Sequence, residues 1–167
     1  YCITTEEGPA VAAGVVNNLL CAAGIDEKFI TLSLGVLDTS TNRLKLALAG
    51  HMPIIIRRVD GTVEELGEEI AGFPLGIMND VEYGQIEIEL FPGDVGVVYS
   101  DGVTDARSPS EELYDTKENR RLIKRVIEAG GTPAALGKSI LQEIREFSKG
   151  HSQADDITLV CFGPLAR

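Results

Sequence analysis

Tryptophan is absent from this 167-residue sequence, and only 5% of its residues are aromatic. Cations are also scarce, because 15 Lys and Arg stand against 26 Asp and Glu, which gives a formal net charge of -11. Binding to nucleic acid needs a basic surface that neutralises phosphates, so this charge argues against DNA or RNA as a partner. An acidic surface remains compatible with divalent cations, with a basic partner or with simple solubility.

Cysteines and long apolar runs are also limited. Cys2, Cys21 and Cys161 form no Cys-x-x-Cys pair, which argues against a zinc site or a disulfide framework and favours the cytoplasm. No apolar run approaches the roughly 20 residues that cross a bilayer, so we expect no membrane insertion. The start YCITTEEGPA lacks both Met and the features of a signal peptide, which predicts a fragment of a longer protein.

Apolar residues make up 44% of the sequence, enough for one sizeable core, so we expect a single domain over residues 1–167. From Gly8 to Gly24 they recur at helical spacing. Alternating patterns then predict strands that follow one another as hairpins. The paired segments are FITLSLGVLD with RLKLALAG, PIIIRR with TVEEL, and QIEIELF with VGVVYS, which is nearly continuous in apolar residues and therefore central.

The C-terminal part of the chain changes character. A charged helical stretch ends at Gly130 and Gly131, after which Thr132 and Pro133 open a second helix that runs to Gly150. The last segment, DDITLVCF, has the pattern of a strand. Hairpins covered by separately grouped helices predict an α+β sandwich with mostly antiparallel sheets.

Two acidic clusters stand at predicted strand ends. Asp101 follows VGVVYS and precedes Gly102, which permits close backbone approach, while Asp155 and Asp156 open the final strand. Mg²⁺ and Mn²⁺ prefer carboxylate ligands, and two such ions activate water for attack on a phosphoryl group. Each cluster alone also fits a simpler role, because Asp-Gly is a common turn and Asp often borders a strand.

Signatures of other enzyme classes are incomplete in this sequence. SDGVT is similar to the Asp-x-Asp-Gly-Thr signature of haloacid-dehalogenase-like phosphatases, but Tyr99 occupies the position of the nucleophilic aspartate. No Walker-type Gly-Lys loop and no Gly-x-Ser-x-Gly elbow occurs, which argues against nucleotide and ester chemistry.

Five segments occur in a characteristic order, namely DEKFITLSLGVLD, LALAGHMP, GFPLGI, PGDVGVVYSDGVTDAR and QADDITLV. From about Pro9 to Phe162 they resemble the SpoIIE and RsbU-like branch of the PPM (phosphatase-2C-like) serine/threonine phosphatases. The resemblance implies an αββα sandwich of mostly antiparallel sheets flanked by helices, with a dinuclear Mn²⁺ or Mg²⁺ centre. It further implies hydrolysis of phosphoserine or phosphothreonine, commonly on anti-anti-sigma STAS-domain proteins, and a sensor or receiver domain in the parent chain.

The resemblance also assigns roles to single residues. By motif match, Asp101 and Asp155 correspond to the catalytic metal ligands of the C-terminal half of the family domain. Gly102 is expected to hold the backbone near the metal, and Asp156 is a further candidate ligand beside Asp155, which we prefer within this pair.

Three further residues match the family's motifs. His51 in AGHMP is either a polar group near the metal or substrate, or a strand-end histidine that satisfies neighbouring backbone groups, and we favour the second role. Asp94 and Asp105 are assigned to turn formation and to helix capping. The loop from Phe73 to Ile77 is expected to serve packing.

One family segment is missing from the sequence. The branch normally has an Asp-x-x-Gly-His-Gly segment before the first helix seen here, which supplies an aspartate that bridges the two metals. Without it, too little negative charge offsets the repulsion between two cations. We therefore expect an N-terminally truncated domain that has little activity alone and whose unpaired edges favour a homodimer. The alternative hypothesis is a non-catalytic PPM-like adaptor that binds proteins.

Overall fold

The computed structural model describes residues 8–24, 28–153 and 155–165 of the chain, which falls into two compact units. Unit 1 takes in residues 1–53 and 66–90, and unit 2 takes in residues 54–65 and 91–167. Each unit has a four-stranded, mostly antiparallel sheet with helices packed on it, which confirms the predicted α+β class. None of the helices in the described ranges is long and apolar enough to span a bilayer.

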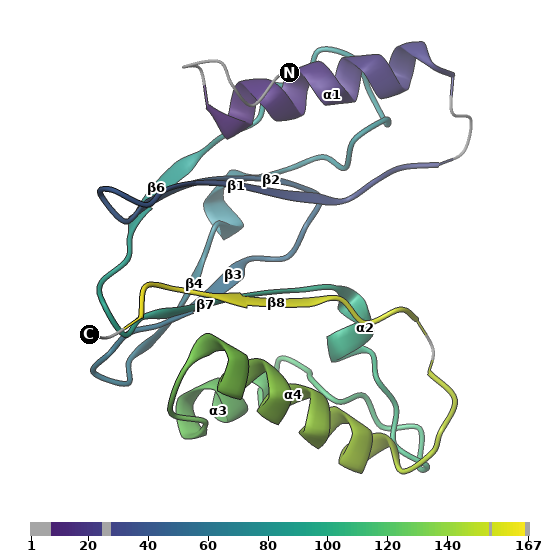
Figure 1. Ribbon diagram of the computed structural model, residues 1–167. Coiled ribbons are helices and arrows are strands. Elements are labelled where there is room, and N and C mark those ends of the chain that lie inside the picture. Colours follow the sequence, from purple (N-terminus) through teal and green to yellow (C-terminus); the bar gives the residue numbers. More distant parts are fainter. Residues whose placement is uncertain (1–7, 25–27, 154, 166–167) are drawn as a thin grey trace. The chain divides into compact units, whose positions relative to one another are not determined.

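The sheet of unit 1 is centred on β2 (Arg43–Ala49). β2 pairs antiparallel with β1 (Leu32–Asp38) and β6 (Ile86–Glu89), and parallel with the two-residue β5 (Ala71–Gly72). Figure 1 shows α1 (Pro9–Ala22) lying along this sheet. The predicted first helix and first hairpin are therefore confirmed.

The core of unit 1 forms where α1 meets the sheet. Its buried members are small or aliphatic residues and one tyrosine: Ala13, Ala49, Leu75 and Tyr83. Asn17 is a buried polar residue on the same helix, and its Nδ2 donates to the Met78 carbonyl at 2.8 Å. Because Asn17 Oδ1 also accepts from the Gly76 N–H at 2.9 Å, this amide fixes the loop that follows β5. The predicted loop from Phe73 to Ile77 thus packs in the core beside α1 through the Leu75 side chain, and it bonds to the helix through the Gly76 N–H.

The sheet of unit 2 has the strand order β4–β3–β7–β8. Its strands are β3 (Ile54–Arg57), β4 (Val63–Leu66), β7 (Val95–Tyr99) and β8 (Leu159–Phe162). β7 pairs antiparallel with β3 on one side and with β8 on the other, so the prediction that it is central is confirmed.

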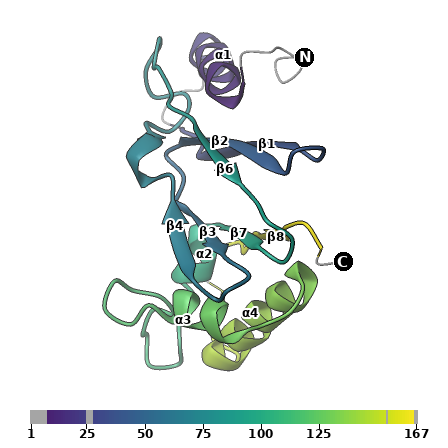
Figure 2. The same cartoon turned by 90° about the vertical axis from the view of Figure 1, so that its left-hand side faces the viewer.

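Two helices cover one face of this second sheet, as Figures 1 and 2 both show. They are α3 (Arg121–Glu128) and α4 (Pro133–Ser148). Thr132 caps α4 as predicted, because its Oγ1 accepts from the Ala135 N–H at 3.3 Å. The buried side of α4 consists of Leu136, Ile140 and Ile144. The charged stretch that predicted α3 was SPSEELYDTKENRRLIKRVIEAGG, and the helix covers only its last part because it begins at Arg121.

The predicted hairpin between QIEIELF and VGVVYS is wrong. β6 joins the sheet of unit 1 through β2, whereas β7 joins the sheet of unit 2 through β3 and β8. Alternation of apolar residues indicates a half-buried strand, but it contains no information about which strand is the neighbour.

Asp94 gives a physical reason for this separation. Its side chain is buried, and Oδ2 accepts from the Phe91 N–H at 3.0 Å, which closes the predicted turn. The same carboxylate accepts from the Val59 N–H at 2.9 Å and pairs with the Arg58 guanidinium at 2.9 Å. Both residues belong to the turn between β3 and β4, so Asp94 attaches the start of β7 to β3.

Candidate functional site

Asp101 lies at the junction between β7 and a short helix, α2 (Asp101–Thr104), at the end of β7 in Figure 1. Ser100 is the N-cap residue with extended backbone, and its carbonyl accepts from the Val103 N–H at 3.0 Å. Asp101 therefore lies just beyond the C-terminal end of the apolar strand β7, at the edge of the sheet that the strand ends form, and its side chain is exposed.

The second acidic segment reaches the same edge because β8 runs antiparallel to β7, with Leu159 opposite Tyr99. Ser100 joins the two segments through three hydrogen bonds. Its N–H donates to the Thr158 carbonyl at 3.0 Å, and its Oγ accepts from the Thr158 N–H at 2.9 Å. Ser100 Oγ also donates to the Asp156 carbonyl at 3.0 Å. These bonds hold the chain before β8 against the start of α2.

Gly102 is buried at the point of closest approach. A Cβ at this position would lie 2.4 Å from the Asp156 carbonyl oxygen and 3.2 Å from that of Asp155. Only a residue without a side chain fits there, so the close backbone approach predicted for Gly102 is present. The structure thus brings the two predicted acidic segments together, although they are far apart in the sequence.

The acidic residues of the second segment lie before β8 rather than in it, since the strand begins at Leu159. Asp155 and Asp156 are both exposed. Asp155 Oδ1 accepts from the Asp156 N–H at 2.7 Å, and the Asp155 carbonyl accepts from Gln153 Nε2 at 2.6 Å. The two carboxylates therefore occupy a loop with local hydrogen bonds and open access to solvent.

The donors at this edge are carboxylate and carbonyl oxygens, the type that Mg²⁺ and Mn²⁺ prefer. Their number is small, because no group of three or more His, Cys, Asp or Glu side chains suited to a metal occurs in residues 8–24, 28–153 and 155–165. The described residues therefore fit a divalent metal by donor type and fall short of a complete ligand set.

Other residues singled out by the sequence have mainly structural contacts. His51 follows β2, and its Nδ1–H donates to the Met52 carbonyl at 3.0 Å, which agrees with the role we favoured. Asp105 ends α2, where its N–H donates to the Asp101 carbonyl at 2.8 Å. Burial raises the pKa of Tyr99 to about 12, so its phenol supplies no anionic ligand at neutral pH.

Sequence reasoning missed the part played by Ser100. A serine directly before Asp-Gly at the end of an apolar strand is a pattern typical of a helix N-cap, and this signal could have identified it. No comparable local signal predicts its hydrogen bonds to the segment before β8, because those partners are distant in the sequence.

The family model described as "Stage II sporulation protein E (SpoIIE)" matches residues 2–163. The chain belongs to the SpoIIE family. One relative in curated proteins is Protein IcfG of Synechocystis sp., which is 32% identical over 132 residues, 79% of this chain and 20% of IcfG. Another is Phosphoserine phosphatase RsbU of Bacillus subtilis, which is 36% identical over 81 residues, 48% of this chain and 24% of RsbU.

Solved structures show which fold this SpoIIE-family chain has. The SiaA-PP2C domain of Pseudomonas aeruginosa matches with a TM-score of 0.76 and 22% identity over 93% of this chain and 60% of that one. The phosphatase domain of SpoIIE from Bacillus subtilis, in a structure described as Mn presoaked, matches with a TM-score of 0.69 and 18% identity. That match covers 99% of this chain and 71% of the solved one. The predicted PPM-type fold class is confirmed.

The SpoIIE-family chain spans only part of these relatives. It covers 20% of IcfG and 24% of RsbU, about a fifth to a quarter of each curated protein.

Proposed function

We propose that this chain is the phosphatase portion of a bacterial, cytoplasmic signalling protein that removes phosphate from serine or threonine. The observation that carries this proposal is the meeting of Asp101 and Gly102 with Asp155 and Asp156 at one sheet edge, in a chain of the SpoIIE family. Residues 1–167 act as one domain in this proposal, because the β3–β4 hairpin of unit 2 interrupts the sequence of unit 1.

Asp101 and Asp155 are the proposed metal ligands, and Asp156 is the second candidate in its pair. Because Gly102 has no side chain, the backbone of the loop that contains Asp155 and Asp156, here called the acidic loop, lies close to α2. Mn²⁺ or Mg²⁺ would supply an activated water for attack on phosphorus when bound. The exposed position of the carboxylates supports this role, since a protein substrate reaches such an edge without rearrangement of the core.

The proposed substrate is a STAS-domain phosphoprotein, and a sensor or receiver domain in the parent chain is the proposed regulator. The family membership and the name of RsbU, a phosphoserine phosphatase, support the phosphoserine substrate.

A non-catalytic adaptor is the second candidate function. The small number of metal donors within the described residues favours it, because a dinuclear centre needs more ligands than Asp101, Asp155 and Asp156 provide. The adaptor would use the same fold to bind a partner protein without hydrolysis.

Phosphatase assays distinguish the two functions. The full natural protein that carries this sequence and the 167-residue chain are assayed with Mn²⁺ on an aryl phosphate and on a phosphoserine STAS protein. We expect activity in the full protein and negligible activity in the 167-residue chain, which lacks the Asp-x-x-Gly-His-Gly segment.

Substitutions then test the assigned ligands. Asp101→Asn and Asp155→Asn should each lower kcat/KM of the full protein at least about 100-fold, because each removes a metal ligand. Asp80→Asn is the matched control, since Asp80 is an exposed loop residue of unit 1. Full activity in both ligand variants would refute the site, and an inactive natural protein would favour the adaptor.

A further inference from the structure

Ser100 connects the two acidic segments of the candidate site within unit 2. Its N–H donates to the Thr158 carbonyl, and its hydroxyl both donates to the Asp156 carbonyl and accepts from the Thr158 N–H. Among the described residues, every hydrogen bond between residues 100–105 and residues 155–158 involves Ser100. The polar attachment of the acidic loop to the strand end beside Asp101 therefore depends on one serine.

The side chain of Ser100 departs from the usual role of a serine at its position. A serine at an N-cap normally accepts a hydrogen bond from an N–H of the first helical turn. Ser100 is the N-cap residue of α2, but its side chain makes no capping hydrogen bond. Both bonds of its hydroxyl go to the segment before β8 instead. The hydroxyl thus stabilises the acidic loop rather than the helix that follows it.

The carboxylates of the candidate site have few contacts of their own. In the described part of the chain, no hydrogen bond or ion pair engages the side chain of Asp101 or Asp156. The Asp155 carboxylate accepts only from the neighbouring Asp156 N–H. The loop is held through its backbone, because Gln153 Nε2 donates to the Asp155 carbonyl and Ser100 Oγ donates to the Asp156 carbonyl. The backbone therefore determines where these carboxylates lie.

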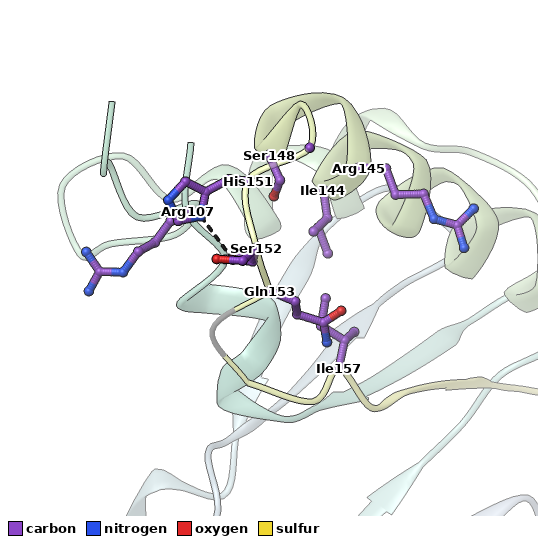
Figure 3. Close-up of a pocket in the computed structure, with 10 residues that line it drawn as sticks. Arg107, Ile144, Arg145, Ser148, His151, Ser152, Gln153 and Ile157 are labelled. Atoms are coloured by element: carbon purple, nitrogen blue, oxygen red, sulfur yellow. Dashed lines mark hydrogen bonds between the residues drawn. The ribbon is translucent and has the colours of Figure 1, made fainter. Parts of the chain in front are cut away.

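Packing fixes the acidic loop only in part. Gln153 and Ile157, which flank the two aspartates in the sequence, both line a cavity of about 300 Å³ (Figure 3). These residues border open space rather than closely packed side chains, so packing alone constrains the loop weakly. Gly102 removes a steric barrier to the approach of the loop, but it has no side chain with which to hold the loop there. The hydroxyl of Ser100 supplies the missing bond.

We infer that Ser100 is a positioning residue for the proposed metal site. Its hydroxyl fixes the backbone of the acidic loop, so that the carboxylates of Asp155 and Asp156 stay at the sheet edge where Asp101 lies. Contacts that hold metal ligands without touching the metal typically change metal affinity about 10–100-fold. The inference rests on the proposed phosphatase function and adds to it a residue that acts through the ligands.

The Mn²⁺ affinity of the full natural protein tests this role, measured by isothermal titration calorimetry. Ser100→Ala removes the hydroxyl and should raise the Kd for Mn²⁺ about tenfold or more. Ser100→Thr keeps a hydroxyl at the same position and should restore most of the affinity. At limiting Mn²⁺, Ser100→Ala should also hydrolyse p-nitrophenyl phosphate more slowly. This deficit should shrink as Mn²⁺ is raised, because mass action refills a weakened site.

Ser108→Ala is the matched control. Ser108 makes with Glu112 the same two bonds that Ser100 makes with Thr158, because its N–H donates to the Glu112 carbonyl at 3.0 Å and its Oγ accepts from the Glu112 N–H at 3.2 Å. Ser108 also lies in unit 2, and among the described residues it has no hydrogen bond to the acidic loop. Its substitution should leave the Kd for Mn²⁺ unchanged.

Hydrogen exchange tests the same coupling in the unsubstituted protein, so the result does not depend on how well a variant folds. Coupling between two equilibria is reciprocal. Since the bond between Ser100 and Thr158 favours Mn²⁺ binding in this account, Mn²⁺ must slow exchange of the Thr158 N–H. The Glu112 N–H, which bonds to Ser108 in the same way, should exchange at an unchanged rate. Hydrogen-exchange mass spectrometry with and without Mn²⁺ measures both.

Equal Kd values for Ser100→Ala and Ser108→Ala, or equal exchange at Thr158 with and without Mn²⁺, would overturn the inference and leave the proposed function intact. A Kd for Ser100→Thr as high as that for Ser100→Ala would also contradict a role of the hydroxyl. Absence of both Mn²⁺ binding and p-nitrophenyl phosphate hydrolysis in the unsubstituted protein would instead refute the proposed function, and the inference with it.

Discussion

The Cα of Gly102 faces the carbonyl of Asp156 so closely that a Cβ on the glycine would lie 2.4 Å from the carbonyl oxygen. The contact is between a buried residue of α2 and backbone, which has no rotamer with which to move aside. Any side chain at position 102 must therefore displace the loop before β8 or distort α2.

Gly102→Ala should lower the free energy of unfolding by about 1–3 kcal/mol, the usual cost of forcing extra atoms into a packed site. Chemical denaturation monitored by circular dichroism measures this change. Gly130→Ala is the control, because a Cβ there meets nothing within 4 Å and the glycine has no positive φ. Equal stability of Gly102→Ala and the unsubstituted protein would show that the loop moves without cost.

Asp94→Ala should destabilise the protein through loss of a buried acceptor. The substitution leaves the Val59 and Phe91 N–H groups and the Arg58 guanidinium without this carboxylate. We expect the free energy of unfolding to fall by about 2–3 kcal/mol, measured by urea denaturation.

Glu64→Ala is the matched control for Asp94→Ala, since Glu64 is a more exposed partner of the same arginine. Exposed ion pairs contribute little, so this variant should lose less than about 1 kcal/mol. A larger loss in Glu64→Ala than in Asp94→Ala would contradict the importance assigned to the buried carboxylate.

His151 and Glu111 should titrate as a linked pair. The hydrogen bond that His151 Nε2–H donates to the Glu111 carboxylate raises the pKa of His151, and the same bond lowers the pKa of Glu111. The stability that His151 contributes is complete below its unfolded pKa and is lost as pH rises through its raised folded pKa. That of Glu111 is present above its unfolded pKa and is lost as pH falls through its lowered folded pKa.

The pair therefore stabilises the loop after α4 most between the unfolded pKa of Glu111 and the unfolded pKa of His151, where both contributions are present. In Glu111→Gln, the NMR titration of the His151 ring should move to lower pH, because the imidazolium loses its carboxylate partner. Glu112→Gln removes the same charge from the neighbouring exposed residue and should leave the His151 titration nearly unchanged. The same titration curve in both variants would exclude the hydrogen bond as the cause.

Asn17→Ala should weaken the attachment of the loop after β5 to α1. The substitution leaves the Gly76 N–H and the Met78 carbonyl without their partner, which costs roughly 2 kcal/mol. Hydrogen exchange should accelerate at Gly76 more than at α1 amides. Asn18→Ala, at the exposed neighbouring position, should show a smaller effect. Unaltered exchange at Gly76 in Asn17→Ala would contradict the proposed attachment.

Local patterns of the sequence predicted those elements whose burial follows a regular period. The buried residues Leu136, Ile140 and Ile144 of α4 recur at helical spacing, so the apolar period identifies this helix without knowledge of its neighbours. The leucines of β2 alternate along the strand and are buried, namely Leu44, Leu46 and Leu48. The same patterns could not place β6 beside β2, because strand pairing depends on contacts far apart in the sequence.

The candidate site was predictable in its residue types and less so in its geometry. Asp101 and Gly102 were identifiable from a strand end and an Asp-Gly pair. The start of β8 at Leu159 was not predictable in the same way. The segment DDITLVCF has the pattern of one strand, but its first residues, including Asp155 and Asp156, form a loop. The cavity beside that loop depends on the packing of α4, which no local pattern in the sequence describes.

The chain passes between its two units at residues 53–54, 65–66 and 90–91, so neither unit is a continuous segment of sequence. During synthesis, β3 and β4 leave the ribosome well before β7, the strand that pairs with the other edge of β3. The backbone groups on this edge of β3 therefore have no strand partner until Val95–Tyr99 has been synthesised. The strand contains the buried residues Ile54, Ile55 and Ile56. A nascent chain that pauses in this interval exposes an apolar strand edge, which is the kind of surface that chaperones bind and that aggregates nucleate on.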